Sequence, residues 1–432
     1  MKAMRSALRA LVLVALAGYA VSAQQQHATA PGAATPASVG ISGERLNRLH
    51  AGMQGFVDRK EAAGIVTLIA RDGKVVDVTA VGFQDVAAKT PMRTDTLFRI
   101  ASMTKPVTSV AVMMLYEEGR LLLTDPVSKF IPAFKSSRVL EGAAEAPVAA
   151  RRGINLRDLL THRSGLTYGF VNGGPVGGGY RTNGVTDGLT VTSMTLAEAI
   201  DKLAAEPLVA QPGAAWNYSL ATDVLGRVVE VASGMPFQVF LRERIFKPLR
   251  MADTDFVVPE AKWSRLATVY APDGAGGIRP MTDPESFGNT VMSPNASYKE
   301  GKTYFSGGAG LVSTARDYAR FGQMLLNGGE LDGSRLLSPK TIELMTASHT
   351  ADLPGGSLGA GTQFGLGFRV VADLGATQTL GSNGMYGWSG IYGTNFWVDP
   401  RERLLAIVMV QRYPGSPVAG AFTPLVYQAL VR

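Results

Sequence analysis

The chain has 432 residues, of which 46% are hydrophobic and 18% are charged, and this composition is typical of a globular protein and excludes a largely disordered one. It contains no cysteine, which excludes a disulfide scaffold, an iron-sulfur cluster, a cysteine-ligated zinc site and a cysteine nucleophile. The formal net charge is +7, but the basic residues are scattered along the chain, so we do not expect nucleic acid as a partner.

Histidine is another side chain from which a metal centre can be built. The chain has four, at positions 27, 50, 162 and 349, and no two of them stand at the spacing of a helical ligand pair. The sequence therefore predicts no metal site.

Residues 1–23 are typical of a secretory signal. Three basic residues precede an apolar run over residues 11–20, and Val21, Ser22 and Ala23 supply the small residues of a cleavage site. The apolar run is about half of the roughly 20 residues that a membrane-spanning helix needs, so we expect no stable membrane anchor. Cleavage would leave Gln24 first, in a secreted and periplasmic protein.

The segment after the signal begins with a tether and continues into the folded part. Residues 24–39 contain Pro31 and Pro36 and predict a flexible tether outside the core, so that the folded domain covers residues 40–432. After a possible cap at Ser42, apolar residues from position 46 to position 57 recur at helical spacing. Residues 65–70 and 75–81 flank an Asp-Gly turn and predict a β-hairpin.

The strongest local signal for chemistry is Ser102 followed by Lys105, at the start of an apolar helix. Residues three apart on a helix share a face, so the lysine amine would reach the serine hydroxyl. A serine hydroxyl becomes a nucleophile when a neighbour takes its proton, and burial favours the neutral amine that can do so. The helix N-terminus would add N–H groups for an oxyanion. The simpler alternative is a serine cap beside a solvated lysine.

A glycine-rich stretch at residues 171–188 shows little periodicity and predicts a mobile flap over the cleft. Tyr168, Phe170 and Tyr180 would line its underside. Shortly before it, His162 is interpreted as a hydrogen-bonded structural histidine, because no GxSxG stands between a predicted strand and a predicted helix, where the nucleophile elbow of a Ser-His-Asp hydrolase would lie.

The middle of the chain has helical patterns over residues 194–205, 222–232 and 237–246. Tyr218 lies in a turn-like stretch before the second of these helices. A tyrosine beside an ammonium group can relay a proton between a serine, a leaving group and solvent. Tyrosines also occur at helix starts for packing reasons, which is the alternative here.

Near the C-terminus, glycines alternate with larger residues from Tyr386 to Gly393 and lead into a strand. The small residues would let a substrate lie along the backbone, and the Ile391 N–H could serve as a second oxyanion donor facing Ser102. A tight turn at a strand start is the alternative.

Residues 394–398 and 404–411 predict a second hairpin, and residues 422–431 predict a closing helix. Strands at both ends of the chain with helices between them predict an α/β (α+β) fold. In this arrangement residues 40–100 and 300–432 form one antiparallel sheet flanked by helices, and residues 101–299 form a mostly helical lobe.

Together, the serine–lysine helix, Tyr218-Ser219-Leu220 and Trp388-Ser389-Gly390 resemble in order the three motifs of the serine β-lactamase-like superfamily. The chain is most similar to family VIII carboxylesterases, which look like class C β-lactamases. Residues 159–166 and 306–329 resemble two further stretches of the family. The resemblance implies a β-lactamase-like fold, Ser102 as nucleophile, Lys105 and Tyr218 as the base system, and the N–H groups of Ser102 and Ile391 as the oxyanion hole.

Two departures from class C β-lactamases bear on the substrate. Leu220 stands where those enzymes have the asparagine of a YxN motif, and Trp388 stands where they have a lysine. Both changes remove polar contacts to a β-lactam, which predicts weak activity on β-lactams. Trp388, Ser389, Gly390 and Leu220 would instead offer a mainly apolar wall to an ester.

The resemblance therefore implies a serine hydrolase that needs no cofactor and cleaves small carboxylic esters, with short to medium acyl chains, through an acyl-enzyme. A β-lactamase, a D-alanyl-D-alanine carboxypeptidase or another amide hydrolase, and an acyltransferase would share the mechanism. A non-catalytic peptidoglycan-binding protein with the same fold is the alternative from another class.

Overall fold

The computed structural model of the chain describes residues 26–27, 34–140, 146–298, 301–353 and 358–432. The predicted signal at residues 1–23 and half of the predicted tether lie outside these residues. The described end of the tether differs from the prediction, because residues Pro36–Val39 form a 3-10 turn and Val39 is buried in the core. The folded part thus begins before Gly40.

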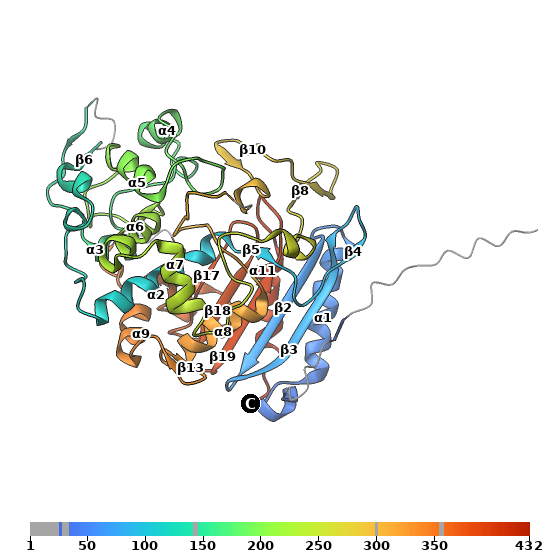
Figure 1. The fold of residues 1–432 in the computed structure, drawn as a ribbon. Helices are drawn as coiled ribbons and strands as arrows, with labels where there is room; N and C mark the ends of the chain where they lie inside the picture. Colours follow the sequence, from blue (N-terminus) through green and yellow to red (C-terminus); the bar gives the residue numbers. More distant parts are fainter. Residues whose placement is uncertain (1–25, 28–33, 141–145, 299–300, 354–357) are drawn as a thin grey trace, which may run out of the picture.

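An antiparallel sheet of nine strands, counted over the described residues, dominates one half of the molecule (Figure 1). Its strands come from both ends of the chain, as the positions of the two predicted hairpins indicate. In spatial order they are β1 (Gln26–His27), β3 (Lys74–Asp85), β2 (Gly64–Arg71), β19 (Leu404–Met409), β18 (Asn395–Asp399), β17 (Tyr386–Ser389), β16 (Arg369–Val371) and β15 (Thr362–Phe364), with β4 (Thr90–Pro91) beside β3.

Both predicted hairpins are present, and the first has the turn conformation that its Asp-Gly sequence suggests. Asp72 and Gly73 both have positive φ between β2 and β3, which suits a tight two-residue turn. In the second hairpin, β18 and β19 pair from Asn395↔Val408 to Asp399↔Leu404. β19 then pairs with β2, which joins the C-terminal hairpin to the N-terminal one.

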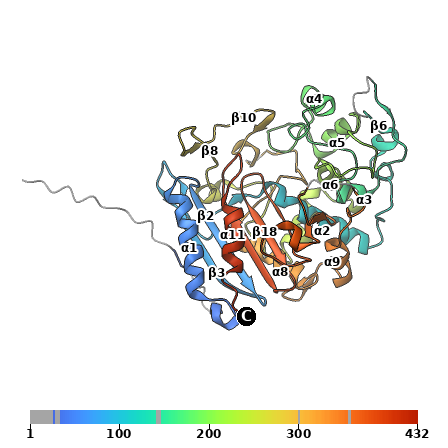
Figure 2. The same ribbon diagram turned by 180° about the vertical axis from the view of Figure 1, so that it is seen from behind.

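Helices cover both faces of the sheet (Figures 1 and 2). On one face α1 and α11 lie side by side, and on the other α8 packs on β2, β18 and β19. The helices are α1 (Gly43–Asp58), α2 (Thr104–Glu117), α3 (Leu156–Leu160), α4 (Pro175–Thr182), α5 (Leu196–Ala204), α6 (Ala221–Ser233), α7 (Phe237–Leu241), α8 (Ala315–Leu326), α9 (Pro339–Thr346), α10 (Leu374–Thr377) and α11 (Val418–Tyr427).

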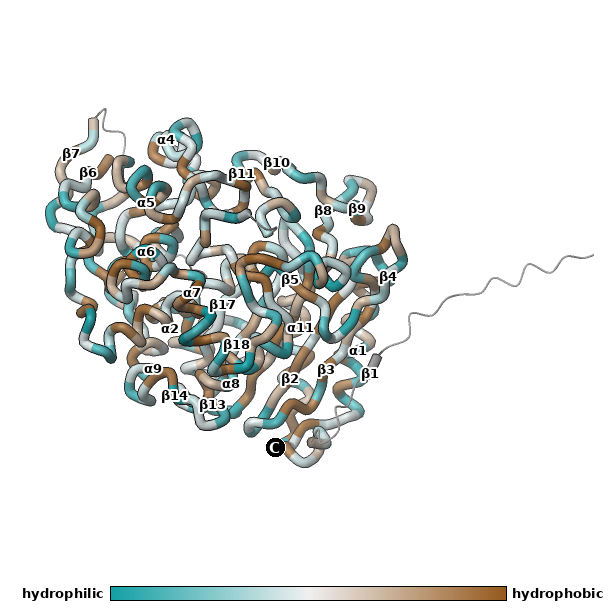
Figure 3. The backbone as a smooth tube through the Cα atoms, in the orientation of Figure 1, coloured by the Kyte–Doolittle hydropathy of each residue, from teal (hydrophilic) through white to brown (hydrophobic). Residues whose placement is uncertain are grey.

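The alternation of side chains along β2 and β19 divides the hydrophobic core in two. Ile65 and Ile69 face the layer of α1 and α11, whereas Val66 and Leu68 face the larger core that α2, α6 and α8 share. Hydrophobic stretches run along β2 and β3 in Figure 3. Each fully buried aliphatic side chain of this kind contributes about 1.5–3 kcal/mol.

The helical half contains α3 to α7 and meets the sheet along α2 (Figure 1). The three predicted helices of this region are found as α5, α6 and α7, the last continued by a π turn over Arg242–Phe246. Two features differ from prediction: α4 forms inside the glycine-rich stretch, and α11 begins at Val418 and ends at Tyr427 instead of covering residues 422–431.

Short two-stranded ladders connect these parts. They are β5 (Phe98–Arg99) with β12 (Val312–Ser313), β6 (Arg138–Val139) with β7 (Val148–Ala149), β8 (Tyr270–Pro272) with β9 (Ile278–Pro280), β10 (Glu285–Phe287) with β11 (Thr290–Met292), and β13 (Glu330–Leu331) with β14 (Ser334–Arg335). In the described part of the chain, no single helix has both the length and the hydropathy to cross a membrane. The segments Ala221–Ser233 and Phe237–Phe246 meet these two criteria only when they are taken together, and the chain bends by 81° between them.

Candidate active site

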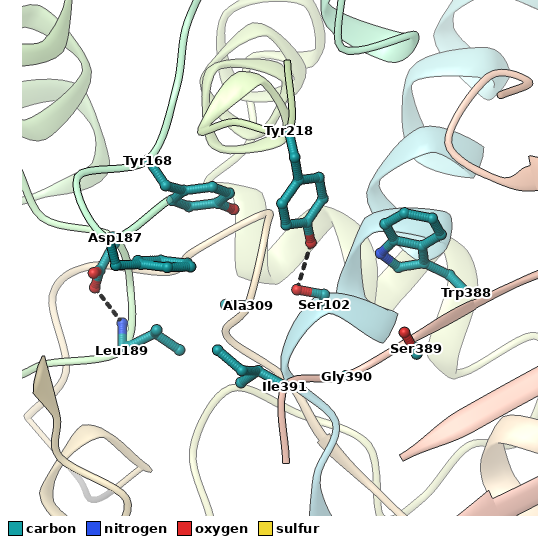
Figure 4. A pocket seen from close by; sticks show the side chains of 11 residues that line it. Ser102, Tyr168, Asp187, Leu189, Tyr218, Ala309, Trp388, Ser389, Gly390 and Ile391 are labelled. Atoms are coloured by element: carbon teal, nitrogen blue, oxygen red, sulfur yellow. Dashed lines mark hydrogen bonds between the residues drawn. The ribbon is translucent and has the colours of Figure 1, made fainter. Parts of the chain in front are cut away.

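Ser102 lies at the junction of the sheet half and the helical half, in a 3-10 turn over Ala101–Met103 that leads directly into α2. The backbone of Ala101 has φ 41°, a left-handed conformation that is costly for a residue other than glycine. The surrounding structure enforces it, because Ile100 donates its N–H to the Leu311 carbonyl at 3.0 Å. As a result the Ser102 hydroxyl faces a pocket (Figure 4).

Lys105 lies in the first turn of α2 and is 1% exposed. Its Nζ donates hydrogen bonds to the Ser102 Oγ at 3.3 Å and the Tyr168 hydroxyl at 3.0 Å. A third bond goes to the Gly308 carbonyl at 2.8 Å. The site thus places three hydrogen-bond acceptors around the lysine nitrogen. The predicted contact between the lysine and the serine is therefore present, and the alternative of a solvated lysine is wrong.

Tyr218 is a second side chain that contacts Ser102. It lies just before α6 and donates its hydroxyl hydrogen to the Ser102 Oγ at 2.7 Å (Figure 4). The Lys105 Nζ lies 4.6 Å from the centroid of the Tyr218 ring, a cation–π contact. The serine oxygen thus contacts two groups able to exchange a proton with it.

Asp223, on α6, is a buried counter-charge to Lys105. Its Oδ1 accepts hydrogen bonds from the Tyr304 hydroxyl at 2.9 Å and the Ser306 hydroxyl at 2.6 Å. Burial raises the pKa of the Asp223 carboxyl, and these hydrogen bonds and the charge of Lys105 oppose that rise. The negative charge lowers the cost of burying the lysine.

His162 is buried and hydrogen-bonded, as its interpretation as a structural histidine predicts. Its Nδ1 is 3.1 Å from the Ser219 hydroxyl, and its ring centroid lies 5.0 Å from that of Tyr218. Burial, and then the charge of Lys105, hold the pKa of His162 well below its usual value, so the ring is neutral. It supports the Tyr218 ring and does not contact Ser102 through any of its hydrogen bonds.

The end of β17 approaches the Ser102 turn closely at Gly390. A Cβ at this position would lie 2.3 Å from the Ile100 carbonyl oxygen and 2.3 Å from the Thr394 hydroxyl, so only glycine fits. The next residue, Ile391, lines the pocket, and within the described residues its N–H donates no backbone hydrogen bond. That N–H is therefore free to serve an oxyanion.

The pocket at Ser102 has a volume of about 210 Å³. Besides Ser102 and Tyr218, the pocket is lined by six residues that were predicted to bind substrate or to form the oxyanion hole. The lining residues are Ser102, Tyr168, Phe170, Asp187, Leu189, Tyr218, Ala309, Trp388, Ser389, Gly390 and Ile391. Apart from the catalytic candidates, Asp187 and Ser389, this lining is apolar or aromatic.

Two predicted substrate-binding residues do not line the pocket. Leu220 is 2% exposed and packs in the core at the start of α6, because the chain turns into the helix directly after Tyr218. Tyr180 lies on α4, is 1% exposed and also packs in the core. The helix was not predicted, and it turns this side chain away from the cleft. The predicted apolar wall therefore consists of Trp388 without Leu220.

Three lining residues were not predicted. Asp187 and Leu189 lie at the end of the glycine-rich stretch, where no periodicity indicates which side chains face inward. Ala309 lies in the stretch over residues 306–329. The resemblance of this stretch to the family is the sequence signal that could have placed Ala309 at the site. Among the described residues, no group of three or more His, Asp or Glu side chains is placed to hold a metal ion.

Comparison with known proteins adds to this geometry. The sequence profile of the family described as Beta-lactamase matches residues 49–429. Esterase EstB of Burkholderia gladioli is 33% identical over 384 residues, 87% of this chain and 92% of the relative. An uncharacterized protein of Mycobacterium tuberculosis is 37% identical over 371 residues, 83% of this chain and 88% of the relative. The solved structure of EstCE1, a hydrolase with promiscuous acyltransferase activity, has a TM-score of 0.77 at 30% identity and covers 90% of this chain and 98% of its own.

Proposed function

The chain belongs to the β-lactamase family, and from this membership we propose that it is a serine hydrolase that cleaves carboxylic esters through an acyl-enzyme on Ser102. The observation that carries the proposal is the contact of one serine oxygen with both the Lys105 amine and the Tyr218 hydroxyl. The similarity to esterase EstB and to EstCE1 supports ester hydrolysis as the activity.

The first half of the reaction acylates the serine. The Ser102 Oγ attacks the ester carbonyl while its proton passes to the base system of Lys105 and Tyr218. The N–H groups of Ser102 and Ile391 stabilise the oxyanion that develops. Tyr218 then returns a proton to the departing alcohol oxygen, and the acyl group stays on Ser102.

The second half releases the acid. A water molecule attacks the acyl carbonyl and gives its proton to the same base system, which is free to accept it because it has passed the serine proton to the departing alcohol. The bond to Ser102 breaks, the serine oxygen regains its proton, and the carboxylic acid leaves. No cofactor takes part in these steps.

The pocket supports small esters as substrates. Its volume of about 210 Å³ is below the roughly 300–1,000 Å³ of sites that hold drug-sized ligands, which favours short to medium acyl chains. Trp388 gives one wall an aromatic face, with its ring 5.6 Å from that of Tyr218. No lysine or arginine belongs to the described lining, so a β-lactam carboxylate would find no cationic partner there.

We expect the mature protein to hydrolyse p-nitrophenyl butyrate at least about 100-fold faster, by kcat/KM, than nitrocefin, because the missing charge-assisted contact of a lysine and the missing amide contact of an asparagine are together worth about 3 kcal/mol. Initial rates with both substrates on one enzyme preparation measure this. Faster nitrocefin turnover would make the protein a β-lactamase. Absence of both activities would contradict the proposal and direct attention to peptide substrates or to binding alone.

We also propose that the protein is exported to the periplasm. The basic start, short apolar run and small residues of positions 1–23 support it. N-terminal sequencing of the protein from a cell envelope fraction tests it: Gln24 as first residue supports export, and a protein that keeps Met1 in the cytoplasm contradicts it.

A further inference from the structure

Asp187 brings a carboxylate into the otherwise mainly apolar pocket. It lies between α4 and α5, and its Oδ1 accepts a hydrogen bond from the Leu189 N–H at 3.0 Å, which fixes the side chain (Figure 4). In Figure 4 it lies at the end of the pocket opposite Trp388, with Ser102 between them. A group bound at Asp187 would therefore be part of a molecule that also reaches the nucleophile.

The charge of this carboxylate has no protein cation beside it. Among the described residues, Asp187 forms no ion pair, and the three hydrogen bonds of the Lys105 ammonium go to other groups. The charge of Lys105 acts instead on the buried Asp223, whose pKa it lowers. Burial raises the pKa of Asp187 to about 6, so the group is ionised at neutral pH although its burial disfavours the charge.

Aromatic faces lie in the same pocket. The rings of Tyr168 and Phe170 stack with centroids 4.8 Å apart, and both residues line the pocket together with Asp187. A carboxylate beside aromatic faces is the combination that recognises ammonium groups, quaternary ones included, because both carry negative potential toward the cation. An anionic ligand would be repelled by the same arrangement.

We propose that Asp187 selects esters that carry a positively charged ammonium group. The inference rests on the ester hydrolysis proposed above and specifies its substrate class. Either the alcohol part or the acyl part of the ester can carry the ammonium, so the test has one arm for each.

The test compares each cationic ester with its neutral isostere, in which a tert-butyl group replaces trimethylammonium. Butyrylcholine against 3,3-dimethylbutyl butyrate places the charge on the alcohol. The p-nitrophenyl esters of 4-(trimethylammonio)butyric acid and 5,5-dimethylhexanoic acid place it on the acyl chain. The readout is the ratio of kcat/KM within a pair, which cancels effects common to both substrates.

We expect the ratio to favour the cation by about tenfold in at least one pair, and to fall by about that factor in Asp187→Asn. Asparagine keeps an oxygen for the Leu189 N–H and removes only the charge. Asp201→Asn, on the exposed face of α5, makes the same change in net charge away from the pocket and should leave the ratio unaltered.

The pH dependence of the ratio provides a second readout. In the wild type the preference should decline as the pH falls through about 6, because protonation removes the charge of Asp187, and Asp187→Asn should lack this decline. The titratable groups that interact with Asp187 are Asp223, Tyr168, Tyr304 and Tyr392. Burial raises the pKa of the three tyrosines, so they stay neutral in this range.

The outcomes separate this inference from the proposed function. Hydrolysis of the neutral esters with a ratio near one, or a ratio that Asp187→Asn leaves unchanged, overturns the inference alone. Failure to hydrolyse any of the four esters overturns the proposed function and the inference with it.

Discussion

Replacement of Ser102 with alanine should lower kcat for p-nitrophenyl butyrate by about 10⁴-fold or more, because no acyl-enzyme can then form. The substitution removes one oxygen atom from a half-buried position, so we expect the free energy of unfolding to change little. Stopped assays at high enzyme concentration measure the residual rate. The oxyanion donors and the pocket remain, so a residual rate above that of water is compatible with the account.

The contradicting result would be a Ser102→Ala protein that retains more than about a tenth of the wild-type rate. It would mean that another nucleophile, or a directly activated water molecule, performs the reaction. Thermal unfolding of the variant serves as the control, since an unfolded protein would lose activity for an unrelated reason.

Replacement of Lys105 with alanine should abolish turnover as completely as Ser102→Ala, by about 10⁴-fold, because members of one catalytic unit are not additive. The variant lacks the lysine nitrogen, so the Ser102 Oγ, the Tyr168 hydroxyl and the Gly308 carbonyl each lose the hydrogen bond that it donates. Lys105→Met, which fills the space of the chain, should be equally inactive. Kinetics of the two single variants and of Ser102→Ala/Lys105→Ala measure the coupling.

Lys302 offers a matched control for removal of a buried amine. Burial lowers its pKa to about 7, and its Nζ donates to the Ser297 carbonyl at 2.8 Å. It lines a separate cavity and is not part of the Ser102 pocket. Lys302→Met should keep turnover within about threefold of wild type. Retention of more than about a tenth of the rate in Lys105→Met would refute the role of the lysine.

The elements whose formation depends on local pattern were predictable from the sequence. The hairpin around Asp72-Gly73 and the helix after Ser42 follow from turn chemistry, capping and periodicity, and both are found where expected. The serine–lysine contact is equally local, because one helical turn separates the two residues. The prediction that both ends of the chain share one sheet came from the positions of the two hairpins, whereas the order of the strands was not predicted.

The positions of side chains and helices that depend on tertiary packing could not be predicted from the sequence. Leu220 follows Tyr218 by two residues, yet the start of α6 turns it into the core. Helix α4 contains three consecutive glycines and owes its formation to packing, since glycine disfavours helices, and so Tyr180 was placed wrongly. Asp187 had no periodic pattern to mark it. Two of the three acceptors of Lys105, the Tyr168 hydroxyl and the Gly308 carbonyl, come from distant segments, and only the fold brings them to the lysine.

Covalent labelling tests the central claim most directly. The mature wild-type protein and Ser102→Ala are treated with a fluorophosphonate, and intact mass and peptide mapping follow. The account predicts a single adduct on the Ser102 hydroxyl of the wild type and none on the variant, with loss of esterase activity in proportion to labelling. An unlabelled wild type, or an adduct on any other residue in both proteins, would contradict it.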